Sequence, residues 1–155
     1  METTFIQTPG PGSGHGKRYR PSKAAVRGIV KRSRVTIQKK DQLCCARAIV
    51  TMKARVDGGS TDADYKNMLR GRPIQTNRAK ELHRLANVPE GPCGLKELDM
   101  FQAALPGYQI KVLSIDPPHM IIYAGPVDSD KRILLIKEDG HYDGCNSFGR
   151  FLNKS

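Results

Sequence analysis

The sequence predicts an α+β fold, in which helices pack on a small, mostly antiparallel sheet behind a disordered basic N-terminal leader. Apolar residues recur at helical spacing between residues 44 and 105, and runs typical of strands follow from residue 108 onward. Residues 1–40 combine a Gly/Pro-rich stretch with a concentration of positive charge. We therefore expect a leader over residues 1–40 and one globular domain over residues 41–155.

The leader holds most of the net charge of +11. Its basic residues are Lys17, Arg18, Arg20, Lys23, Arg27, Lys31, Arg32, Arg34, Lys39 and Lys40. A tail of this kind can bind nucleic acid non-specifically or serve as a nuclear address. The alternative is a solvated tail with no dedicated partner. Scattered apolar positions suggest a short helix over 24–31 that packs against nothing and a short strand over 35–37.

Helices are expected at the start of the domain over residues 44–55, 61–69, 75–87 and 95–105. In the first helix, apolar residues from Cys45 to Met52 follow the i, i+3, i+4 and i+7 spacing of a core-facing stripe. In helix 75–87, Leu82 and Leu85 are expected on the buried stripe. His83 lies next to that stripe and is expected to be a partly exposed surface residue.

Strands are expected over residues 108–115, 119–124 and 132–137, and again from residue 141. The run 132–137 is apolar on both faces, which favours a central position in the sheet. Glu138-Asp139-Gly140 is typical of a hairpin turn and leads directly to His141.

Cys44 and His141 are the candidates for chemistry. A free cysteine has a pKa near about 8.5. A position at the start of a helix favours the thiolate, through the unpaired backbone N–H groups and the positive end of the helix dipole. Asp143 lies two residues after His141, so on a strand both side chains point the same way and the carboxylate can orient the ring. The alternative for Cys44 is a buried core thiol.

These two stretches resemble the motifs of the OTU (ovarian-tumour) family of cysteine peptidases. The first family motif, Asp-Gly-Asn-Cys-Leu-Phe-Arg-Ala-Leu/Ile, is similar to the stretch from Asp41 to Ile49, and the second, His-Tyr-Asn/Asp, is similar to 141–143. The chain departs from the family at Gln42 and Leu43, where Gly and Asn or Asp are usual. The resemblance spans 41–152 and also extends to the OTU-like domain that precedes the DNA polymerase in Maverick/Polinton elements.

The resemblance implies a thiol (iso)peptidase with Cys44 as nucleophile, His141 as base and Asp143 as orienting group. It also implies an oxyanion site at the loop of Asp41, Gln42 and Leu43. Ubiquitin or ubiquitin-like conjugates would be the substrate class, and the reaction would need no cofactor. Two alternatives stay open: a degenerate OTU-like module that binds ubiquitin without cutting it, and an accessory module of a viral or transposon polymerase that helps to hold nucleic acid.

Composition excludes several other classes. No stretch approaches the roughly 18 apolar residues of a membrane span, and the N-terminus lacks a signal-peptide pattern. The four cysteines include an adjacent pair and show no small-domain disulfide spacing, which favours reduced thiols in a cytoplasmic or nuclear protein. Neither the paired ligand spacing of structural zinc sites nor a G-x-S-x-G serine hydrolase motif occurs, so no metal site is expected.

Overall fold

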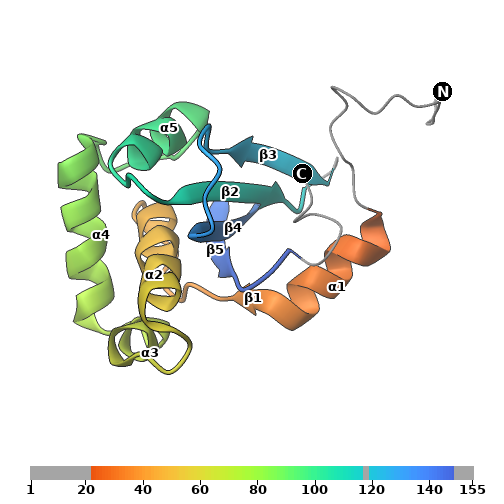
Figure 1. Cartoon of the computed structure of the whole chain (residues 1–155), viewed down its shortest axis with the longest axis horizontal. Helices are drawn as coiled ribbons and strands as arrows, with labels where there is room; N and C mark the ends of the chain where they lie inside the picture. Colours follow the sequence, from red (N-terminus) through yellow and green to blue (C-terminus); the bar gives the residue numbers. More distant parts are fainter. Residues whose placement is uncertain (1–21, 117–118, 149–155) are drawn as a thin grey trace.

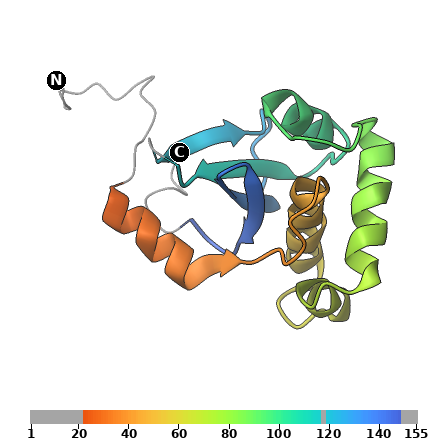
Figure 2. The ribbon, with the colours of Figure 1, turned by 180° about the vertical axis from the view of Figure 1, so that it is seen from behind.

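A computed structural model describes residues 22–116 and 119–148 of the chain. Within this part the α+β prediction is confirmed. The helices are α1 (Lys23–Ser33), α2 (Cys44–Gly58), α3 (Ala63–Leu69), α4 (Pro73–Ala86) and α5 (Leu95–Ala103). The strands are β1 (Arg34–Val35), β2 (Gln109–Ser114), β3 (Met120–Ala124), β4 (Arg132–Glu138) and β5 (His141–Cys145). Helices α2 to α5 gather on one side of the sheet and α1 lies on the other (Figures 1 and 2).

The strands form one mixed sheet in the order β1-β5-β4-β2-β3. The β2–β4 pair is parallel, and the other pairs are antiparallel, as the sequence predicted for most of the sheet. Strand β4 lies in the middle of the sheet, and its side chains alternate between two apolar clusters. Ile133 and Leu135 join the main core with α2, whereas Leu134 and Ile136 lie in a second cluster with Phe148.

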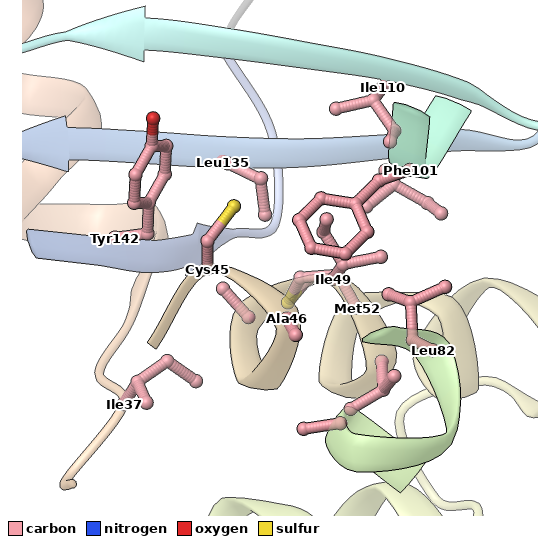
Figure 3. Close-up of a cluster of buried hydrophobic side chains, with 14 of the residues drawn as sticks. Ile37, Cys45, Ala46, Ile49, Met52, Leu82, Phe101, Ile110, Leu135 and Tyr142 are labelled. Atoms are coloured by element: carbon pink, nitrogen blue, oxygen red, sulfur yellow. The ribbon is translucent and has the colours of Figure 1, made fainter. Parts of the chain in front are cut away.

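The expected boundary at residue 41 is wrong, because part of the leader belongs to the folded domain. Strand β1 pairs with β5 at the edge of the sheet. Ile37 is buried in the main core, where Figure 3 shows it near the start of α2. Val26 of α1 is also buried, so this helix does pack. Residues 1–21 of the expected disordered leader lie outside the described residues.

The stripe predicted for α2 is buried, but burial continues around the helix, because Arg47, Val50 and Thr51 are buried as well. The stripe predicted for α4 is wrong at two positions. Leu85 is 59% exposed, whereas His83 is 7% exposed. His83 can enter the core because its Nδ1 is hydrogen-bonded to the carbonyl of Val88 at 2.8 Å and its ring meets Phe101 edge-on.

Two glycines bring β5 to its position. Asp139 and Gly140 both have positive φ angles, 54° and 80°, as a two-residue hairpin between β4 and β5 requires. Gly144 lies against α2 so closely that a Cβ atom there would collide with the side chain of Met52. Strand β5 therefore packs directly on the helix that begins with Cys44. None of the helices in the described residues is long and apolar enough to cross a membrane.

The burial of Ile37 can be tested by mutation. Ile37→Ala should lower the free energy of unfolding by about 2–4 kcal/mol in chemical denaturation, because it leaves a cavity in the main core. The exposed neighbour Thr36 is the matched control, and Thr36→Ala should change the same quantity by less than about 0.5 kcal/mol. Equal small effects at both positions would show that residues before 41 lie outside the core.

Candidate active site

Cys44 is the first residue of α2 and is half-buried. It lines a cavity of about 530 Å³ together with His141, and a neighbouring cavity of about 210 Å³. Asp41 and Gly140 line both cavities as well. The two candidate catalytic side chains, almost a hundred residues apart in sequence, thus face one shared space.

His141 is oriented by Asp143, as the i, i+2 spacing predicted. The Nε2 atom of His141 lies 2.9 Å from Oδ1 of Asp143. A carboxylate only accepts hydrogen bonds, so Nε2 carries the proton of the neutral ring and Nδ1 keeps its lone pair. Nδ1 is therefore the ring nitrogen that can accept a proton from a thiol.

Asp143 is itself held by three donors. Its side chain is 2% exposed. Besides the ring of His141, Oδ1 accepts a hydrogen bond from the backbone N–H of Ile37 at 2.8 Å. Oδ2 accepts from the guanidinium of Arg34, with Nε at 2.7 Å. The same guanidinium bonds Glu138 at 3.0 Å, so the buried charge of Asp143 is both paired and hydrogen-bonded.

The electrostatics of Cys44 differ from the prediction. Burial raises the pKa of the Cys44 thiol above its ordinary value, although hydrogen bonds from the backbones of Tyr142 and Cys45 work in the opposite direction. The negative charge of Asp41 also raises this pKa. Near neutral pH the sulfur therefore holds its proton, and a base has to remove that proton for the sulfur to attack.

The loop before Cys44 is a turn held by hydrogen bonds to Asp41. The Oδ1 atom of Asp41 accepts the backbone N–H of Leu43 at 3.0 Å, and its carbonyl accepts the N–H of Cys44 at 3.2 Å. Among the described residues, no acceptor is found for the N–H of Gln42. In the expected oxyanion loop, the N–H of Leu43 is therefore already hydrogen-bonded, and the N–H of Gln42 is the donor that remains available.

Arg47 is a buried cation that fixes this turn. Its side chain is 3% exposed and donates to both carboxylate oxygens of Asp41, at 3.1 and 2.8 Å. It also donates to Gln75 and Thr76 at the start of α4, at 3.3 and 2.7 Å. This arrangement lowers the pKa of Asp41, chiefly through the hydrogen bonds from Arg47. Arg47 and Asp41 therefore form an ion pair whose cation is buried.

The other side of the smaller cavity is formed by the loop between α4 and α5. Cys93 in this loop lines the cavity, and its carbonyl accepts the hydroxyl of Tyr142 at 2.7 Å. The sequence assigned no role to Cys93, and it placed Arg34 only among the basic residues expected to bind nucleic acid. One sequence signal for a structural role of Arg34 is the short strand expected over 35–37. A strand that enters the domain there also places the residue before it in the sheet.

The basic residues expected to bind nucleic acid divide into three groups. Lys17, Arg18 and Arg20 lie outside the described residues. The expectation for Arg34 is corrected, because its guanidinium is engaged with Asp143 and Glu138. The exposed ones are Lys23, Arg27, Lys31, Arg32, Lys39 and Lys40. In the described part of the chain, no three His, Cys, Asp or Glu side chains are placed so that they could hold a metal ion.

Comparisons with known proteins give a single weak likeness. No family model matches the chain, and no curated protein matches it. The crystal structure of the viral OTU domain protease from Farallon virus is similar at 16% sequence identity, over 76% of this chain and 86% of that chain, with a TM-score of 0.40. Similarity at this level carries no assignment of function, so the chemistry has to come from the residues of the site.

The role of Arg47 can be tested by Arg47→Met, which keeps much of the buried volume and removes the donors. We expect a loss of about 2 kcal/mol in the free energy of unfolding, because Gln75 and Thr76 lose a charged partner. The half-exposed carboxylate of Asp41 is partly solvated and adds little. We also expect slower alkylation of Cys44 as the turn loosens.

Arg78→Met is the matched control on α4. Arg78 pairs with Asp64 on the surface, so its loss should cost less than about 1 kcal/mol and leave the alkylation of Cys44 unchanged. Equal stability of the two variants would show that the buried ion pair does not hold the turn.

Proposed function

We propose that the protein is a cysteine peptidase that cleaves peptide or isopeptide bonds. The observation that carries this proposal is the cavity shared by Cys44 and His141, with His141 held by Asp143. A nucleophile, a base and a group that orients the base are the elements of acyl transfer through a covalent intermediate.

The reaction starts from a neutral thiol. The sulfur of Cys44 bonds to the substrate carbonyl carbon while its proton passes to Nδ1 of His141. Burial raises the pKa of the thiol, so His141 acts as a general base at the moment of attack. The oxyanion that forms would accept the N–H of Gln42, the available donor in the 41–43 turn.

The intermediate then collapses. The C–N bond breaks as His141 returns the proton to the leaving amine, which leaves a thioester on Cys44. Water next attacks the thioester carbon and gives a proton to His141. The C–S bond breaks as His141 passes this proton to the sulfur, and the released carboxylic acid loses its proton to solvent. Asp143 stabilises the protonated ring and keeps its orientation through both halves of the cycle.

Ubiquitin or a ubiquitin-like conjugate is the substrate class we propose. This choice derives from the resemblance of 41–49 and 141–143 to the OTU motifs. The competing proposal is a module that binds ubiquitin without cutting it, favoured by the departures at Gln42 and Leu43.

A ubiquitin that carries a C-terminal electrophile distinguishes these proposals. The wild type should form a covalent adduct at Cys44, detected by mass spectrometry, and Cys44→Ala should form none. His141→Ala should label roughly 10²–10⁴-fold more slowly near neutral pH, because the general base is lost. Its residual rate should keep increasing into the alkaline range, because burial raises the pKa of the Cys44 thiol and the thiolate forms only there.

Two further variants complete this experiment. Asp143→Asn keeps acceptors for Ile37 and His141 but removes the charge, so its rate should lie between those of the wild type and His141→Ala. Cys45→Ala should still be labelled at Cys44. A wild type that binds ubiquitin and is never labelled would establish the binding module instead.

Nucleic acid is a second candidate partner, through α1. Lys23, Arg27 and Lys31 are exposed and follow one another at i, i+4 and i+8, so they share a face of the helix. No acidic residue occurs in α1 to oppose them. This surface would suit a module that accompanies a polymerase, as the second resemblance implies.

Charge reversal tests this surface. Lys23→Glu, Arg27→Glu and Lys31→Glu combined should weaken binding to double-stranded DNA and reduce the slope of log K against log [salt], because fewer counterions are released. The control reverses the same number of charges, at the exposed Lys66, Lys80 and Lys96 on α3, α4 and α5, and should change the affinity less. Equal loss in both variants would assign the binding to overall charge rather than to α1.

A further inference from the structure

Three cysteines from two distant parts of the chain meet at the smaller cavity. Cys44, Cys45 and Cys93 all line it. The sulfur atoms of Cys45 and Cys93 lie 3.0 Å apart, although 48 positions separate the two residues. Both are free thiols, Cys45 buried in the core and Cys93 half-buried. Nothing in the proposed acyl transfer uses either of them.

The pair is held in place from both sides. Cys45 is the second residue of α2 and lies in the core beside Tyr142 and Leu135 (Figure 3). Cys93 lies in the loop before α5, where the hydroxyl of Tyr142 binds its carbonyl at 2.7 Å. The following residue, Gly94, donates its N–H to Glu97 at 2.8 Å and so caps α5. These contacts keep the two cysteines next to each other.

We propose that Cys45 and Cys93 are a site of reversible oxidation by hydroperoxides, at which the two thiols form a disulfide bond and Cys44 takes no part. A disulfide bond is about 2.05 Å long, so the sulfurs have to approach each other by roughly 1 Å. Cys93 can supply this movement because it lies in a loop rather than in a helix or strand. The inference does not depend on the proposed peptidase activity.

The reaction proceeds in two balanced steps. The thiolate of Cys93 attacks the hydroperoxide ROOH, the O–O bond breaks, and Cys93 becomes a sulfenic acid while RO⁻ takes up a proton and leaves as ROH. The sulfur of Cys45 then attacks the sulfenic sulfur, loses its proton, and displaces hydroxide, which leaves as water. Two thiols are oxidised by two electrons and one hydroperoxide is reduced.

The electrostatics favour Cys93 as the first sulfur to react. The contact with Cys45 lowers the pKa of the Cys93 thiol, against the opposing effect of burial. Burial raises the pKa of Cys45 and also that of Cys44. Peroxide reacts with accessible thiolates, so Cys93 should be oxidised before Cys44.

Peptide mapping of the full chain tests the proposal. After a limiting dose of hydrogen peroxide, free thiols are alkylated and the protein is digested with trypsin without reduction. We expect the peptide 41–47 to be linked to the peptide 85–96, and dithiothreitol to release the link. Cys44→Ala should leave the link intact, whereas Cys45→Ala and Cys93→Ser should each abolish it. Cys145→Ala is the control, because Cys145 is buried in the second cluster and should not change the link.

Two results would overturn the proposal. One is a link that disappears in Cys44→Ala and survives in Cys45→Ala, which would make Cys44 the partner of Cys93. The other is oxidation of Cys44 to higher acids in the wild type before any link between the two peptides appears. Cys93→Ser removes the other thiol of the pair from a half-buried loop position, so a folding defect of Cys45→Ala would not obscure the outcome.

Discussion

A buried carboxylate holds the candidate site together. Asp143 is almost inaccessible to solvent, and an isolated charge in that position would be costly. Its oxygens are satisfied by a ring nitrogen of His141, a backbone amide at Ile37 and the guanidinium of Arg34. One side chain on β5 therefore joins the base of the proposed reaction to the segment that enters the domain through β1.

The nucleophile side of the site is organised in a similar way around a buried cation. Arg47 binds the turn that precedes Cys44 and reaches the first turn of α4. Helix α2 packs against the β4–β5 hairpin on one side and against α4 on the other (Figures 1 and 2). The site thus depends on two buried charges, Arg47 and Asp143, that line neither cavity.

The sequence predicted local features well. The stripe of α2, the central β4 and the hairpin before His141 depend on spacing within a few residues, and each is present in the structure. The pairing of His141 with Asp143 follows from the two-residue period of a strand in the same way.

What the sequence did not predict depends on contacts between distant residues. Arg34 looked like one charge among many in a basic leader, and only its partner 109 positions away gives it a separate role. His83 entered the core because the carbonyl of Val88 satisfies its ring, which no helical pattern reveals. The pKa of Cys44 was predicted from the helix terminus alone, whereas burial beneath the neighbouring loop and strand outweighs that effect.

The contact between Arg34 and Asp143 has a consequence for biosynthesis. Translation proceeds from the N-terminus, so the segment that anchors Asp143 emerges from the ribosome more than a hundred residues before Asp143 itself does. Helices α2 to α5 can form while His141 is still within the ribosome, and Cys44 then has no base beside it. The nascent chain would therefore carry its thiol without the neighbouring imidazole, and the candidate site would be assembled only when β5 joins the sheet.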